Sequence, residues 1–277
     1  AMSGGTTFLI SREDVARFAR WSGDSNPLHV DAAHASRTFF GTPVAHGILA
    51  ALRALGVAPV RGGAPASLEV AFRGVIFPEQ RYEVATETNS TTVLGDGEAK
   101  LVRRVDADAQ RAAELEGQTQ PVGSDASAPR GRRETPADPT IDDLEASAGL
   151  SGRYDVESPP DVYRDGGLSD FQLRALALCS YVVGMEMPGR RSLFTGLRIV
   201  FHQPHFDGAA IDYRLRVVRF SRELRILDTA LEIFGPDGAC LCSAELRAYV
   251  PFSPLETDVA LLAASLREQA TTGRGVA

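Results

Sequence analysis

Residues that could carry out acid–base chemistry gather in one short segment, between positions 21 and 47. Asp24 and His29 are five positions apart, and Gly23 and Pro27 interrupt any regular helix through this point. Within a turn, a carboxylate and an imidazole at this spacing can point into one pocket, whereas an ideal helix or strand would direct them differently. The residue types and their spacing therefore predict an acid–base pair for moving protons to and from a substrate.

The same segment ends at a predicted helix start. His46 and Gly47 precede the apolar run ILAALRALGVA, which predicts a helix over residues 47–57 that enters a core. The first N–H groups of a helix have no partner within it, and a glycine at that point lets a ligand approach closely. An acid, a base and an anion-binding helix start in one segment predict an active site.

The flanking elements must position this segment. Ser11 is the expected N-cap of a short helix that leads into it, and Asp31 is expected to cap another short helix after it. Residues 67–106 alternate apolar and polar side chains and contain the turn Gly95-Asp96-Gly97, a pattern that predicts antiparallel strands. Helix first and strands afterwards is thus the predicted order of the N-terminal part, residues 1–106.

A second block repeats that order with different residues. Residues 169–185 have apolar side chains at helical spacing after a cap at Ser169 or Asp170, and alternating segments follow. Residues 107–160 are rich in Ala, Gly, Pro, Ser and Asp, which predicts an exposed linker or insertion. Residues 161–277 then form the predicted second half, which ends in an amphipathic helix.

Composition limits the classes of function. The chain has 277 residues, of which 44% are hydrophobic, and a net charge of −7, so we expect a large core and no nucleic-acid-binding surface. The three cysteines fit free thiols in a reducing compartment. The sequence shows neither the pattern of a signal peptide nor an apolar run of about 20 residues. We therefore expect a cytoplasmic protein that is not bound to a membrane.

A metal centre is not expected. His202 and His205 flank Pro204 at a predicted strand end, and no set of Cys, Asp or Glu has the spacing of zinc ligands. Cys179 lies in an apolar helix without an evident base, which argues against a nucleophile.

The run GDSNPLHVDAAHA, followed by PVAHGIL, resembles the signature of the MaoC-like (R)-specific enoyl-thioester hydratases and 3-hydroxyacyl dehydratases. Trp21 stands where that family usually has Tyr or Phe, and Ala35 fits its trailing small residue. The second half has no such run, so it cannot carry the same pair. The matching residues are Gly23, Asp24, Asn26, Pro27, Leu28 and His29.

The resemblance implies an α+β double hotdog fold, in which two central helices are each wrapped by an antiparallel sheet and lie side by side as a pseudo-dimer. It also implies that Asp24 and His29 form the catalytic pair and that Gly47 supplies an N–H to the oxyanion. Asn26 and His46 would orient the pair or contact the substrate. The second half would have lost catalysis and would shape the acyl pocket.

The activity that the resemblance implies is reversible hydration of trans-2-enoyl thioesters to (R)-3-hydroxyacyl thioesters. No cofactor is expected beyond the coenzyme A or phosphopantetheine that carries the substrate, and the carrier is either coenzyme A or an acyl carrier protein. The chain would act as a monomeric double hotdog or as a homodimer of it. The alternatives are a non-catalytic acyl-thioester-binding or assembly subunit, and a hotdog thioesterase.

Overall fold

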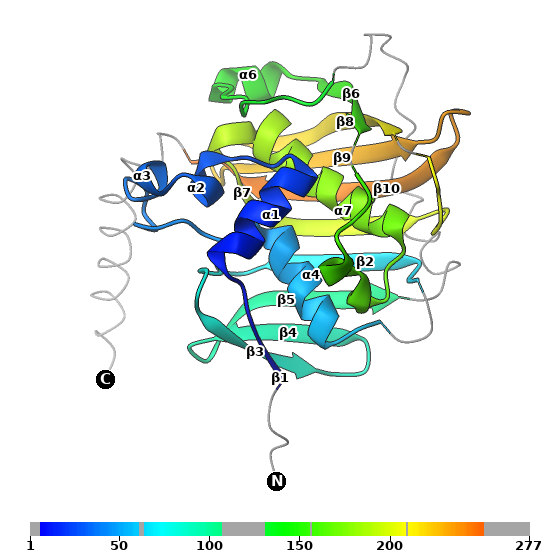
Figure 1. Ribbon diagram of the computed structural model, residues 1–277. Helices are drawn as coiled ribbons and strands as arrows, with labels where there is room; N and C mark the ends of the chain where they lie inside the picture. Colours follow the sequence, from blue (N-terminus) through cyan, green and yellow to red (C-terminus); the bar gives the residue numbers. More distant parts are fainter. Residues whose placement is uncertain (1–5, 61–63, 107–130, 156, 209, 252–277) are drawn as a thin grey trace, which may run out of the picture.

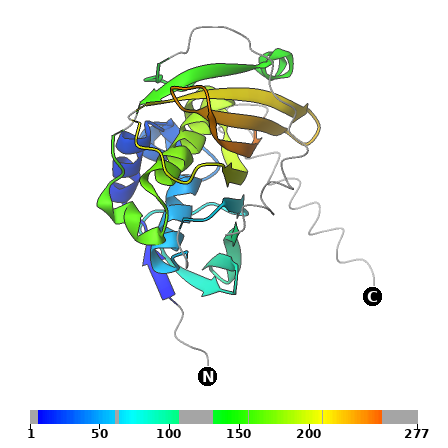
Figure 2. The same ribbon diagram turned by 90° about the vertical axis from the view of Figure 1, so that its right-hand side faces the viewer.

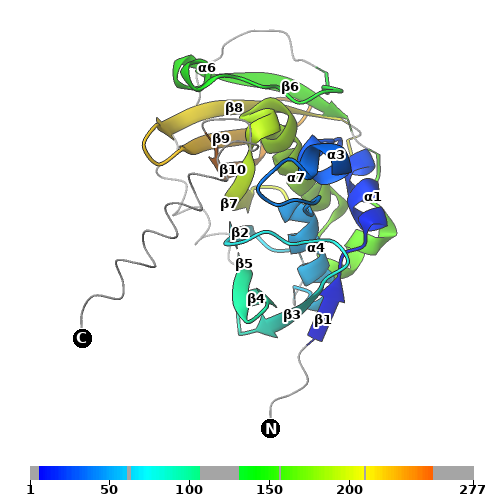
Figure 3. The ribbon, with the colours of Figure 1, turned by 90° about the vertical axis from the view of Figure 1, so that its left-hand side faces the viewer.

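The computed structural model describes residues 6–60, 64–106, 131–155, 157–208 and 210–251. These residues form one antiparallel sheet of ten strands, with most of the helices on one face (Figure 1). Viewed along its edge, the sheet curves around the helices (Figures 2 and 3). None of the helices in the described ranges has the length and apolar character needed to span a membrane.

The first half contributes five strands, in the order β1-β3-β4-β5-β2 across the sheet. Its helices precede β2, as the sequence predicts, and α4 lies against the concave face (Figure 1). The elements are β1 Thr6–Leu9, α1 Arg12–Ser22, α2 Pro27–Val30, α3 Ala32–Ala35, α4 Gly47–Val57, β2 Ser67–Phe72, β3 Arg81–Thr86, β4 Ser90–Gly95 and β5 Glu98–Asp106.

The second half repeats this order as β7-β10-β9-β8-β6, so each strand has a counterpart in the first half. Its central helix, α7, lies beside α4 on the same face (Figure 1). The elements are α6 Ile141–Ala146, β6 Gly149–Asp155, η1 Asp161–Gly166, α7 Asp170–Tyr181, η2 Val182–Glu186, η3 Gly189–Arg191, β7 Leu193–Phe201, β8 Ala210–Ser221, β9 Ile226–Phe234 and β10 Cys240–Tyr249.

Strands β2 and β7 join the halves. They pair antiparallel from Ser67 opposite Val200 to Ala71 opposite Gly196. Burial follows the expected period of two in β10, where Ala244, Leu246 and Ala248 are buried between exposed neighbours. The predicted α+β double hotdog is therefore confirmed.

The predicted linker 107–160 is wrong in its C-terminal part. Strand β6 lies inside that range and pairs with β8, so the second half begins before residue 161. The sequence did not predict this strand because it contains two glycines, which are uncommon inside strands. Both glycines are needed for space: a Cβ atom at Gly149 would collide with the backbone of Leu215, and one at Gly152 with the ring of Tyr213. Residues 107–130 and the predicted C-terminal helix lie outside the described residues.

The expected helix caps are present. Ser11 and Asp14 form a capping box at the start of α1, and Ser169 forms one with Gln172 at the start of α7. Asp31 accepts hydrogen bonds from the N–H groups of Ala33 and His34, although α3 is only one turn long. The helix predicted over 47–57 has those bounds.

Candidate active site

The chain turns sharply between α1 and α2, and this turn holds the predicted site residues. Gly23 ends α1 with a left-handed φ of 73°, a conformation that glycine adopts without strain. Asn26 then caps α2 by accepting a hydrogen bond from the N–H of Leu28, and Pro27 occupies the first helical position. Asp24 is thereby held between two short helical segments with its side chain turned inward.

The carboxyl group of Asp24 is buried, with 2% of the residue exposed, and it lies against the second half of the chain. Ser180 of α7 donates a hydrogen bond to Oδ2 over 2.7 Å. A Cβ atom at Gly184 of η2 would collide with the same carboxyl group, so the glycine leaves the space that this group occupies. Both halves therefore contribute to the position of Asp24.

His29 lies one turn farther along and presents one free ring nitrogen. Its Nδ1 lies 2.8 Å from the carbonyl oxygen of Val44, and because a carbonyl only accepts, Nδ1 carries the proton. In the neutral imidazole, Nε2 is then the acceptor nitrogen. His29 as a whole residue is partly exposed.

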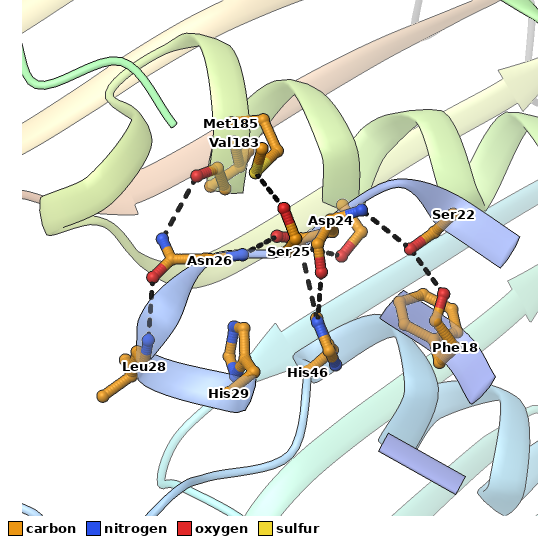
Figure 4. A network of polar contacts seen from close by, with 12 residues as sticks. Phe18, Ser22, Asp24, Ser25, Asn26, Leu28, His29, His46, Val183 and Met185 are labelled. Atoms are coloured by element: carbon orange, nitrogen blue, oxygen red, sulfur yellow. Dashed lines mark hydrogen bonds and ion pairs between the residues drawn. The ribbon is translucent and has the colours of Figure 1, made fainter. Parts of the chain in front are cut away.

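His46 supports both members of the predicted pair. Its Nε2 lies 2.9 Å from the backbone oxygen of Asp24 and 4.0 Å from the Oδ2 atom of the same residue. Its ring lies 3.9 Å from that of His29 and 4.9 Å from that of Phe18, measured between centroids. In Figure 4 the two imidazoles lie side by side below Asp24. His46 thus packs between the pair and the core.

Burial shifts the acid–base properties of all three groups toward their neutral forms. It raises the pKa of Asp24, an effect that His29 and the Ser180 hydrogen bond oppose. It lowers the pKa of His29 to about 3, with the neighbouring His46 adding to the shift, and that of His46 to about 4. At neutral pH both imidazoles are therefore free bases, and the carboxyl group retains a proton more readily than an exposed one.

Gly47 begins α4 at the accessible edge of the site. The residue before it, His46, makes no capping hydrogen bond with its side chain. Gly47 is partly exposed, whereas Ile48 and Leu49, the next residues, are fully buried. The start of α4 thus offers the uncapped N–H end of a helix next to the histidines.

Asn26 fastens the turn to the second half. Its Nδ2 lies within hydrogen-bonding distance of three backbone oxygens there, those of Gly184 (3.1 Å), Gly189 (3.3 Å) and Arg190 (3.4 Å). The structure thus gives Asn26 a place between the two halves, behind Asp24.

Three of these side chains could also bind a metal ion. Asp24, His29 and His46 each offer one ligand atom, and these atoms lie within 4.8 Å of one another. Hydrogen bonds to carbonyl groups already occupy Nδ1 of His29 and Nε2 of His46. A metal ion would therefore compete with these hydrogen bonds or use the Nε2 of His29, which is the atom that an acid–base reaction would use.

Sequence reasoning brought Asp24, His29, Asn26, His46 and Gly47 to one place but missed Ser180 and Gly184. These two residues lie about 160 positions away along the chain and have no motif of their own. One signal was present, because Ser180 is a polar residue within the otherwise apolar stretch ALALCSYVV. The spacing of the residues around Ser180 does not indicate which distant group its hydroxyl group contacts.

Comparison with known proteins agrees with this architecture. Residues 5–110 match the MaoC like domain. A stretch of 42 residues is 50% identical to a 3-hydroxybutyryl-CoA dehydratase of Methylorubrum extorquens, which is 15% of this chain and 27% of that protein. The match thus covers about a quarter of the length of the curated relative.

Solved structures resemble a larger share of the chain. A MaoC-like dehydratase is 14% identical with a TM-score of 0.60, over 88% of this chain and 96% of the other. A MaoC domain protein dehydratase of Chloroflexus aurantiacus is 11% identical with a TM-score of 0.60, over 90% and 93%. A conserved protein of Mycobacterium tuberculosis, described as a double hotdog, is 14% identical with a TM-score of 0.59, over 90% and 96%. The first half thus matches the MaoC like domain, and the chain has a double hotdog fold.

Proposed function

We propose that the chain is a hydro-lyase that reversibly adds water to trans-2-enoyl thioesters and forms (R)-3-hydroxyacyl thioesters. The observation that supports this most is the juxtaposition of a buried carboxyl group and a neutral imidazole beside the start of α4. Addition of water to an enoyl thioester requires a base, an acid and a donor for the enolate oxygen. These three roles fall to His29, Asp24 and the N–H of Gly47.

In the direction of hydration, the Nε2 of His29 takes a proton from water while the oxygen of that water bonds to Cβ. The electron pair of the double bond moves toward the thioester carbonyl, whose oxygen becomes enolate-like and is stabilised by the N–H of Gly47. Asp24, in its carboxylic acid form, then gives its proton to Cα. Transfer of the proton from His29 back to Asp24 restores the starting state, and dehydration runs through the same steps in reverse.

The substrate is an acyl thioester carried on coenzyme A or on the phosphopantetheine of a carrier protein. The partial match to a 3-hydroxybutyryl-CoA dehydratase supports the coenzyme A form. The thioester itself acidifies the proton on Cα, so the residues of the chain supply proton transfer and electrostatic stabilisation.

The test is hydration of a trans-2-enoyl-CoA by the wild type and by the Asp24→Asn and His29→Ala variants, followed through loss of the enoyl absorbance. We expect each variant to lose about 10²–10⁴-fold in kcat, and chiral analysis to find the (R)-3-hydroxyacyl product. Release of free thiol with the enoyl group intact would instead identify a thioesterase. Tight binding without turnover by the wild type would identify an acyl-binding subunit.

A further inference from the structure

Within the described part of the chain, the site residues differ in their exposure to solvent. Among the site residues, His29 and Gly47 are partly exposed, whereas Asp24, Asn26 and His46 are buried. A thioester must therefore approach over His29 and the start of α4. The side chains that border these two residues therefore determine the shape and polarity of the substrate that can bind.

An aromatic pair borders Gly47. A Cβ atom at Gly47 would lie only 2.9 Å from Cε1 of Phe72, so the ring of Phe72 lies directly against this glycine. The ring of Phe194 lies 5.2 Å from that of Phe72, between centroids. Phe72 ends β2 and Phe194 lies near the start of β7, so the pair sits where the two halves join.

A small apolar cluster, separate from the main core, borders His29. It is built on the buried side chains of Leu28 and Val44. Leu28 precedes His29 in the chain, and the carbonyl group of Val44 accepts the hydrogen bond from its ring. The partly buried side chains of this cluster, taken together with the aromatic pair, form a surface that we call the acyl wall: Phe40, Phe72, Val75, Phe77, Leu193 and Phe194.

The chemistry of the acyl wall suits a hydrocarbon. Its six side chains offer no hydrogen-bond donor or acceptor. The nearby backbone N–H groups of Arg73, Gly74 and Phe77 already donate within the protein, to the carbonyl group of Lys100 and the hydroxyl group of Tyr82. A pantetheine arm carries amide groups that need partners, whereas the chain beyond Cβ of an acyl group needs none.

We propose that the acyl wall binds the hydrocarbon part of the thioester and that Phe72 and Phe194 set the length of acyl chain that the site accepts. This inference rests on the proposed hydro-lyase function, because the thioester carbonyl at Gly47 fixes which part of the substrate meets the rings. Replacing a ring by a methyl group opens space beside the acyl chain, and each methylene that fills such space is worth about fourfold in affinity.

The experiment measures kcat/KM for trans-2-enoyl-CoA substrates of four to ten carbons with the wild type, Phe72→Ala, Phe194→Ala and a control. Phe220→Ala is the matched control, because Phe220 is a partly buried phenylalanine near the end of β8, outside the acyl wall. We expect both wall variants to raise the ratio of kcat/KM between the longest and the shortest substrate by about tenfold or more. The control should leave this ratio unchanged, and Phe72→Leu, which keeps most of the volume, should shift it in the same direction but less.

An equal change at every chain length in Phe72→Ala would overturn the assignment, because the ring would then serve the carrier arm or packing alone. Calorimetric binding of saturated acyl-CoA of the same lengths separates this inference from the proposed reaction. If no substrate is hydrated but Phe72→Ala changes how binding depends on chain length, the acyl wall stands and the proposed reaction fails. If hydration occurs and neither ratio shifts, the reaction stands and the acyl wall fails.

Discussion

Ser180, on the central helix of the second half, donates a hydrogen bond to the carboxyl group of Asp24 in the first half, with 2.7 Å between Oγ and Oδ2. The half that lacks the motif therefore helps to hold the Asp24 carboxyl group of the half that carries it. Gly184, one turn later, leaves room for the same group. The second half thus contributes residues to the candidate site although it lacks the motif.

Ser180→Ala should lower kcat/KM by about 2–10-fold, because a hydrogen bond that positions an uncharged carboxyl group is worth about 0.5–1.5 kcal/mol. The Ser180 hydrogen bond lowers the pKa of Asp24, so its removal should move the alkaline limb of the pH profile to higher pH. Ser192→Ala is the matched control, since the buried Ser192 bonds to the carbonyl group of Val183. A loss of rate with an unmoved alkaline limb would contradict the role given to Ser180.

Asn26→Ala should destabilise the fold by roughly 2–4 kcal/mol, because it removes a helix cap and leaves buried carbonyl groups of the second half without their donor. Urea unfolding measures the change. Ser25→Ala is the control, because the contacts of the Ser25 hydroxyl group are long, at 3.5 and 3.7 Å. Equal stability of the two variants would show that Asn26 does not fasten the turn to the second half.

Asp24→Asn should abolish most of the activity and yet raise the free energy of unfolding at neutral pH by roughly 0.5–2 kcal/mol. Burial raises the pKa of Asp24, so the folded state binds its proton more tightly than the unfolded state and loses stability as the pH rises above 3.8. The advantage of the variant in thermal unfolding should therefore be larger at pH 8 than at pH 4.

Asp31→Asn is a control in which loss of the carboxylate is expected to change the stability in the opposite direction. Hydrogen bonds from the N–H groups of His34 and Ala33 lower the pKa of Asp31, so its charge favours the folded state above the unfolded pKa. This variant should be less stable than the wild type at neutral pH. A stabilising effect of Asp31→Asn, or a destabilising effect of Asp24→Asn, would contradict the electrostatic account of the turn.

In the His46→Gln variant, the free energy of unfolding should fall less than in the wild type when the pH is lowered. Burial lowers the pKa of His46 from 6.5 to about 4, so the unfolded state binds a proton that the folded state refuses between these values. The contribution of His46 to the free energy of unfolding is therefore complete above pH 6.5 and decreases by about 3 kcal/mol as the pH falls toward 4. The measurement is the free energy of unfolding between pH 4 and 7.

The exposed His205 is the control for that measurement, and His205→Gln should keep the slope of the wild type. His29 contributes in the same direction over a wider range, since its pKa falls to about 3. An unchanged slope in His46→Gln would show that the ring is not neutral in the folded state.

The local parts of this site could be predicted from sequence because they depend on neighbours in the chain. Gly23, Asn26 and Pro27 specify a turn by their own backbone preferences, and the alternation of β2 and β5 follows from burial of one face. The repeated order of elements likewise indicated a second half with the same topology.

The remaining features depend on contacts between distant segments. Strand β6 was missed because its glycines, which the neighbouring β8 requires, weaken the pattern of a strand. Ser180 and Asp24 are 156 positions apart and meet only when α7 lies beside the turn. Neither residue has a local preference that reports the other.

The central claim is that Asp24 and His29 act as one unit in the addition of water across the double bond, and a double-mutant cycle on enoyl-thioester hydration tests it most directly. We predict that Asp24→Asn and His29→Ala each lose about 10²–10⁴-fold in kcat and that the double variant is scarcely slower than the worse single variant. Losses that multiply in the double variant, or a single variant with the wild-type rate, would contradict the claim.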